Sequence, residues 1–266
     1  MKTMLPSRSR DALDRYRGSG ELLFENITGE LRMFAGQRLA GLRLKTHKAL
    51  DLGPGPQQFL FGDLEQGYLG TMSTAELTNP ADLSIDVGLS DGSLNPTAVE
   101  WLKFADRGRI LYTPTQYLRN EVSWESLYQA GLVYGRDEDP TFPSPEDVRS
   151  SQLNYVIYQG AVFKVRLLTG FDEDPVSNAT LSSNSEWERL LYKVSLTAGG
   201  EWASYTDTEL GCRGYGRRHW VQESSAADPD QRYYRGDLTI DGIGKAPTTS
   251  VVTYLSWRPV LEWVPK

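Results

Sequence analysis

The sequence predicts an α+β fold in which short helices and short strands are joined by long ordered loops. Residues 154–168 alternate apolar and polar side chains on either side of the two-residue turn Gln159-Gly160, which is the pattern of a β-hairpin. Three short segments carry helix start and stop signals, and 25 glycines and 14 prolines among 266 residues indicate many turns. Strands and helices do not alternate regularly, so a doubly wound parallel sheet is not expected.

The first 52 residues are predicted to form an attachment arm and a hairpin, separate from a body at 57–266. The break is placed at the Gly- and Pro-rich run 51–56. Residues 1–20 predict an extended or partly helical arm, and residues 20–34 predict a strand, a turn at 26–29 and a second strand. A lone hairpin is marginally stable in water, so its apolar residues are predicted to attach to a partner. These attachment residues are Leu22, Phe24, Leu31, Met33 and Phe34.

Within the body, the elements follow from local signals. Aromatic–glycine pairs at 59–70 indicate tight packing, and Asn95-Pro96-Thr97 predicts a helix through Ala105 that ends at Gly108. A strand at 109–112 and a helix at 123–130, with Ser123 as its N-cap, come next. After the hairpin, 185–191 predicts a third helix, 198–250 predicts irregular loops, and 251–255 and 259–264 predict closing strands.

The charge is unevenly distributed along the chain. Residues 1–50 hold ten Lys/Arg and five Asp/Glu, a balance of +5, and the remaining 18 and 30 give −12, which sum to the net −7. The basic residues of the arm are scattered among apolar ones, which favours docking on an acidic protein surface over binding nucleic acid. We expect no membrane span, since no apolar run reaches ~20 residues. The first ten residues lack the apolar core of a signal peptide, so synthesis in a cytoplasm is expected.

Motifs for catalysis are missing, and the sequence predicts neither an enzyme nor a cofactor or metal site. The nucleophile elbow, the phosphate-binding loop and the zinc-protease motif do not occur. With only His47 and His219 and a single cysteine, Cys212, a disulfide is excluded and a His metal site is disfavoured. Cys212 is interpreted as a small loop residue, with a thiolate activated by nearby arginines as the alternative. The acidic run Asp172-Glu173-Asp174 is interpreted as solvated, with Ca²⁺ binding as the alternative. Carboxylate pairs of a glycan hydrolase stay open, because 35 acidic residues offer many pairs.

Two parts of the chain, the segment 20–32 and a series of short segments across about 59–265, match patterns of known proteins. The segment 20–32 resembles hairpins near the attachment ends of phage fibre and appendage proteins. Six segments across about 59–265 resemble segments that occur in the same order in uncharacterised phage virion proteins. These segments of the chain are Ser123-Trp124-Glu125-Ser126-Leu127, Phe163-Lys164-Val165-Arg166-Leu167-Leu168, Asn184-Ser185-Glu186-Trp187, Trp220-Val221-Gln222-Glu223, Arg235-Gly236 and Trp257-Arg258-Pro259-Val260-Leu261-Glu262.

The layout is also similar to the C-type-lectin-like fold of the group that includes the formylglycine-generating enzyme and phage tropism determinants. This likeness depends on Glu186-Trp187, Arg235-Gly236 and Trp257-Arg258-Pro259. Enzymes of that group bind copper through a pair of cysteines, and this chain has only Cys212, so the resemblance does not imply that activity. It implies instead a scaffold that presents long loops for binding.

Together these features predict a virion structural protein of a tail, baseplate or fibre, anchored by residues 1–50 and forming a homo-oligomer, with a trimer favoured. The alternative is a capsid decoration or baseplate adaptor with a purely structural role. Trp124, Trp187 and Trp257 are expected in the core, and Arg258 is expected to stack or to pair with a carboxylate. A host glycan or protein is expected to contact the aromatic and arginine residues of the 199–250 loops. These candidate ligand-binding residues are Trp202, Tyr205, Tyr215, Arg217, Arg218, His219, Trp220, Tyr233 and Tyr234.

Overall fold

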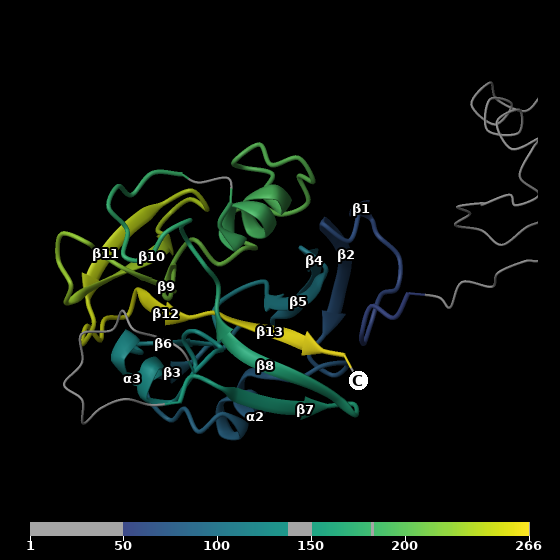
Figure 1. The fold of residues 1–266 in the computed structure, drawn as a ribbon, viewed down its shortest axis with the longest axis horizontal. Coiled ribbons are helices and arrows are strands. Elements are labelled where there is room, and N and C mark those ends of the chain that lie inside the picture. The colour runs from purple at the N-terminus through teal and green to yellow at the C-terminus, as the bar shows by residue number, and fades with distance from the viewer. Residues whose placement is uncertain (1–49, 138–150, 182–183, 266) are drawn as a thin grey trace, which may run out of the picture. The chain divides into compact units, whose positions relative to one another are not determined.

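The computed structural model describes residues 50–137, 151–181 and 184–265 (Figure 1). The chain divides into two units, Met1–Leu50 and Asp51–Lys266, and the described residues belong almost wholly to the second. That unit is mixed and mostly β, with two curled sheets and a few short helices. The predicted arm and hairpin, with Leu22, Phe24, Leu31, Met33 and Phe34, lie outside the described residues, as does His47.

The larger sheet has seven strands, and every neighbouring pair in it is antiparallel. Their order across the sheet is β1 (Phe61–Gly62), β2 (Gln66–Ser73), β4 (Glu100–Asp106), β5 (Arg109–Pro114), β13 (Pro259–Val264), β8 (Ala161–Leu167) and β7 (Asn154–Tyr158). The last strand of the chain therefore lies in the middle of this sheet, between strands from the two halves of the body.

The smaller sheet has six strands and contains one parallel pair, β9 with β12. Its order is β11 (Ile243–Pro247), β10 (Gln231–Gly236), β9 (Arg218–Ser224), β12 (Leu255–Trp257), β6 (Arg119–Asn120) and β3 (Ser93–Leu94). Only Arg258 separates β12 from β13, so the chain passes directly from one sheet into the other at this point (Figure 1).

The junction between the sheets is held by buried side chains. Trp257 is fully buried, as are Trp124 and Trp187, which confirms their predicted core positions. Arg258 is also buried, and of its two expected contacts the structure has the stacking one: its guanidinium lies over the Trp187 ring, 5.8 Å from the ring centre. In place of a carboxylate, the guanidinium donates to the carbonyls of Pro114, Thr115 and Leu210 at 2.8–2.9 Å. Backbone carbonyls satisfy the guanidinium because the ends of several strands converge on this residue.

The helices are short. Pro80–Asp86 forms α2, which the sequence did not predict, with Asn79 as its N-cap. The predicted helix at 123–130 is confirmed as α3 (Trp124–Gln129), capped by the Ser123 hydroxyl. The third predicted helix is present as a π-helix, η2 (Trp187–Tyr192). No helix in the described part of the chain has both the length and the apolar character needed to cross a membrane.

Among the strands, the hairpin of β7 and β8 is confirmed, with the turn residues Gln159 and Gly160 at positive φ. The helix predicted at 95–108 is wrong, because residues 100–106 form β4. This central strand is buried on both faces. Its sequence therefore lacks the alternation of apolar and polar residues that marks a half-exposed strand. Arg107 and Gly108, which resemble a helix end, make the tight turn into β5 with both φ angles positive.

The Gly- and Pro-rich run at 51–56 packs on the body, so the predicted start of the body at residue 57 is too late. Leu52 is buried, and the Lys103 ammonium donates to the Pro56 carbonyl at 2.6 Å. Gly53 has φ +73°, and a Cβ there would lie 2.9 Å from the Trp263 ring. A glycine is thus required where this segment crosses the larger sheet.

Candidate functional site

The candidate ligand-binding residues do not all lie on surface loops. Most of them are buried: Trp202, His219, Trp220, Tyr233 and Tyr234 are each less than a tenth exposed. The loop prediction for 198–250 is wrong because 218–224, 231–236 and 243–247 form β9, β10 and β11. Strands β9 and β10 are covered on both faces, so their aromatic side chains pack in the core. Tyr205 is partly buried, and its hydroxyl lies 2.8 Å from that of Tyr68.

The remaining candidates, Tyr215, Arg217 and Arg218, lie together where strands β9 and β12 begin. Because β9 and β12 are parallel neighbours, the residues that precede them lie at the same end of the strands. Strand β10 is antiparallel to β9, and Gly236 at its end pairs with Arg218 at the start of β9. This topology brings together six residues that we call the Tyr215 cluster: Tyr215, Arg217, Arg218, Tyr234, Asp237 and Tyr254.

Stacking orders the Tyr215 cluster. The ring of Tyr215, which is 66% exposed, lies 6.4 Å from the ring of Tyr254 with an interplanar angle of 18°. The Arg217 guanidinium lies 3.9 Å from the centre of the Tyr254 ring. The guanidinium of Arg218 lies 5.2 Å from the Tyr234 ring and 5.6 Å from the Tyr254 ring. Aromatic faces attract guanidinium groups, so both arginines are held in defined positions.

Asp237 is the carboxylate that both arginines share. Its oxygens lie 2.6 Å from Arg217 Nε and 3.1 Å from Arg218 Nη2. Burial acts to raise the pKa of Asp237, but the hydrogen bonds from the two arginines outweigh it and lower the pKa below its usual value. The cluster therefore has two cations for one anion, and Arg218 Nε is buried without a hydrogen-bond acceptor among the described residues.

The backbone that carries Asp237 is strained. Asp237 and Leu238 have φ +83° and +77°, a region that side-chain-bearing residues rarely adopt. Hydrogen bonds keep them there: the Asp237 amide donates to Arg217 O at 2.9 Å and the Leu238 amide to Cys212 O at 2.7 Å. Strained backbone of this kind concentrates at ligand-binding and active sites. The strain marks the Tyr215 cluster as a built feature of the surface.

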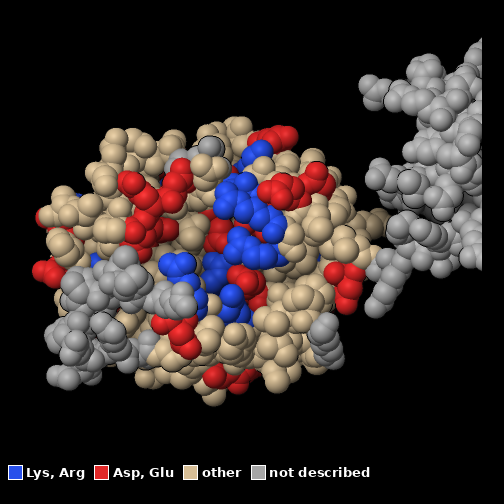
Figure 2. Space-filling view, in the orientation of Figure 1, with Lys and Arg blue, Asp and Glu red and all other residues tan. Residues whose placement is uncertain are grey.

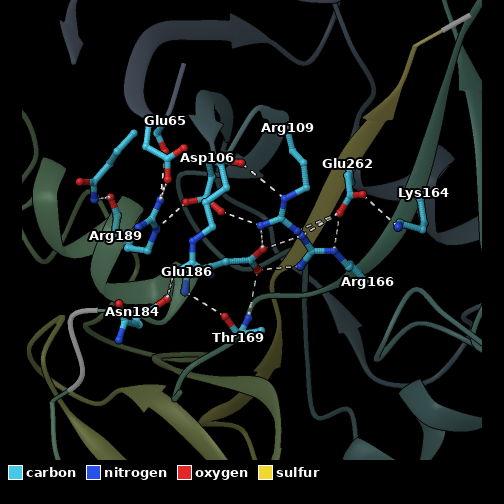
Figure 3. A network of polar contacts seen from close by, with 12 residues as sticks. Glu65, Asp106, Arg109, Lys164, Arg166, Thr169, Asn184, Glu186, Arg189 and Glu262 are labelled. Atoms are coloured by element: carbon cyan, nitrogen blue, oxygen red, sulfur yellow. Dashed lines mark hydrogen bonds and ion pairs between the residues drawn. The ribbon is translucent and has the colours of Figure 1, made fainter. Parts of the chain in front are cut away.

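A second polar feature, the Arg166 network, ties η2 to the central strands β4, β5, β13 and β8 of the larger sheet (Figure 3). Its members are Asp106, Arg109, Lys164, Arg166, Glu186, Arg189 and Glu262. In Figure 2 the lysine and arginine side chains of this face gather near its middle, with acidic side chains around them. At the centre, Arg166 binds Glu186 with two hydrogen bonds of 2.7 Å and Glu262 with one of 3.0 Å.

Two carboxylates of the Arg166 network, Glu186 and Glu262, are held ionised. Burial acts to raise the pKa of Glu186, yet Arg166, Arg109 and the Thr169 amide outweigh it and lower the pKa to about 2. The pKa of Glu262 is lowered in the same way by Arg166 and Lys164, against the effect of burial. Because these two carboxylates are already ionised near neutral pH, they have no proton to donate. The network therefore suits a structural role in positioning η2.

The other chemical alternatives also have defined positions. Burial raises the pKa of Cys212 to about 12, and the thiol is fully enclosed, so the activated-thiolate alternative is wrong. In the acidic run, Asp174 accepts hydrogen bonds from the Ser224 amide and hydroxyl at 2.8 and 2.6 Å. Across residues 50–137, 151–181 and 184–265, no group of three or more His, Cys, Asp or Glu is placed to hold a metal ion.

Among the Asp and Glu residues that the structure describes, only Glu223 has a pKa that rises far above its usual value. It lies on β9, is fully buried, and both its oxygens accept from the Gly170 amide at 3.0–3.1 Å. Burial, with a smaller effect of Asp174, raises its pKa to about 8, so the side chain is neutral at pH 7. Its lack of exposure makes it a buried hydrogen-bond acceptor with no access for a substrate.

Comparisons with known proteins leave the family open: no family model matches the chain, and no similar chain is found among curated proteins or solved structures. Of the predicted ligand-binding residues, the structure brings together Tyr215, Arg217, Arg218 and Tyr234. Sequence reasoning missed Tyr254 and Asp237. Only the pairing of β12 and β10 with β9 reveals them, and the chain between them gives no local signal.

Proposed function

We propose that this chain is a structural protein of a phage virion, on the tail, baseplate or a fibre, and that its body recognises a host surface or protein through the Tyr215 cluster. The observation that supports recognition is the arrangement of the cluster. Tyr215 is exposed and stacks on Tyr254, and Arg217 and Arg218 are held by Asp237, whose backbone has a positive φ. Tyrosine and arginine dominate the energetics of binding surfaces because they combine apolar area with directional hydrogen bonds.

The phage assignment is supported by the sequence resemblance, and so are the C-type-lectin-like fold and the attachment role of residues 1–50. In this proposal the arm binds other virion proteins, the protein forms a homo-oligomer with a trimer favoured, and the body works by binding without catalysis or a cofactor. A scaffold with two curled sheets and long connections between them agrees with presentation of a binding surface.

A second function, that of a capsid decoration or baseplate adaptor, is favoured by a different surface. Strand β7 is an edge strand of the larger sheet. Leu153 directly before it and Tyr155 and Ile157 within it alternate along the chain, with exposures of 38, 50 and 70%. An exposed apolar edge of this kind suits burial against another protein.

The location of the chain in purified particles tests the proposal. We expect mass spectrometry to find the full-length chain in phage particles purified by density gradient, and antibodies against the body to label the tail region by electron microscopy. Labelling spread over the capsid would favour the decoration role. A chain that stays in the soluble lysate and never co-purifies with particles would overturn both virion functions.

A further inference from the structure

We propose that the Tyr215 cluster binds an acidic saccharide, with the sugar ring on Tyr215 and its carboxylate on Arg217 and Arg218. This inference rests on the proposed recognition function and names the class of ligand. It follows from the charge of the cluster, the shape of its exposed surface and the size of the patch.

The net positive charge of the cluster favours an anionic ligand. Arg217 and Arg218 share the single carboxylate of Asp237, so one positive charge is left without a partner in the cluster. Arg213, two residues before Tyr215 in the chain, is exposed as well. This basic spot stands out because residues 51–266 have a balance of −12. A guanidinium binds a carboxylate through two parallel hydrogen bonds, which favours a carboxylate as the missing partner.

The exposed surface of the cluster is a flat ring beside the arginines. Tyr215 is 66% exposed, while one side of Tyr254 is covered by Arg217. A tyrosine face offers apolar area to the C–H groups of a pyranose, and its hydroxyl can bond with sugar hydroxyls.

The size and rigidity of the cluster favour a small ligand over a protein. A stable protein interface buries about 800 Å² and some 20–30 residues on each partner, many more than the six residues of the cluster. The ion pairs of both arginines with Asp237, and the stacking of Arg217 on Tyr254 and of Arg218 on Tyr234, hold the arginines in place before any ligand arrives. Fixed side chains lose little entropy on binding, which matters most for a ligand with few contacts.

Calorimetric titration of the full-length chain tests this inference. The acidic probes are trigalacturonate and 3′-sialyllactose, the neutral probes are maltotriose and lactose, and hexaglutamate serves as an acidic peptide. We expect at least one acidic saccharide to bind about tenfold more tightly than its neutral counterpart, and the affinity to fall as salt is raised. Equal binding of neutral saccharides, equal or tighter binding of hexaglutamate, or binding of neither acidic saccharide would overturn it.

Variants separate the ring from the charge. We expect Tyr215→Ala and Arg217→Gln each to weaken binding of the acidic saccharide about tenfold, while Tyr215→Phe retains most of it. Phe61→Ala and Arg107→Gln alter an exposed aromatic ring and an exposed arginine elsewhere and should leave the affinity unchanged. If no acidic saccharide binds but Tyr215→Ala still reduces attachment to host cells, the ligand class is wrong and the recognition function stands. If no acidic saccharide binds and Tyr215→Ala attaches to host cells as well as wild type does, both the ligand class and the recognition function are wrong.

Discussion

Arg166 donates to both carboxylate oxygens of Glu186, Nη1 to Oε2 and Nη2 to Oε1, each at 2.7 Å. The side chains are only 4% and 6% exposed, and they join β8 to the residue directly before η2. A buried bidentate pair fixes both distance and angle, so the position of η2 against the larger sheet depends on it.

Replacing Arg166 by methionine should strongly destabilise the body. The change leaves Glu186 and Glu262 buried with fewer cations, and breaking a buried ion pair in this way costs about 3–5 kcal/mol. Denaturant unfolding of Arg166→Met and wild type gives the difference in free energy. The matched control is Glu201→Gln, which removes an exposed ion pair with Lys193 and should have a much smaller effect. Equal effects of the two variants would contradict the structural role of the network.

The Arg166 network should also set the acid stability. The folded-state pKa of Glu186, about 2, is below its unfolded value of 4.5, so its contribution is present above pH 4.5 and is lost as the pH falls toward 2. We expect the free energy of unfolding to decrease across this window in wild type and less steeply in Glu186→Gln. Unfolding series at several pH values measure both slopes, and parallel slopes would count against the assignment.

Glu223 should have the opposite pH dependence. Its folded-state pKa of about 8 lies above 4.5, so the stabilisation is complete below pH 4.5 and is lost as the pH rises through 8. The loss is about 1.36 kcal/mol for each pH unit in that window. Glu223→Gln keeps an oxygen acceptor for the Gly170 amide without the ionisable group. The variant should become progressively more stable than wild type between pH 4.5 and 8, and a constant difference would refute the assignment.

The thiol of Cys212 should be inert in the folded protein. It is fully buried and its pKa is raised to about 12, mainly by burial. At pH 8 we expect a thiol reagent to modify it only after denaturant is added, with one equivalent then reacting. Rapid modification of the native chain would show that the loop around Cys212 opens.

Local signals in the sequence were sufficient for some elements and misleading for others. The turn at Gln159-Gly160 and the Ser123 cap have local causes, so the hairpin and α3 could be predicted. Residues 100–106 could not, because a strand covered on both faces has the composition of a buried helix. Strands β9 to β11 were missed because their order depends on pairing with distant segments.

The candidate site divides in the same way. Tyr215 and its arginines stand out by composition, whereas Tyr254 and Asp237 join them only through pairing with β9. Composition also selected Trp202 and Trp220, which the fold buries, since a large aromatic side chain serves a core as readily as a surface. The closing segment 257–263 is where the two sheets meet, and recognition is proposed for the strand ends beside it.

Attachment of the purified full-length chain to host cells tests the central claim, that the Tyr215 cluster is the recognition surface. Fluorescently labelled wild type, Tyr215→Ala and Tyr155→Ala are compared by flow cytometry, since both tyrosines are at least half exposed and only one lies in the cluster. We predict that Tyr215→Ala loses most of the cell-bound signal while Tyr155→Ala retains it. Undiminished attachment of Tyr215→Ala, or loss only in Tyr155→Ala, would contradict the claim.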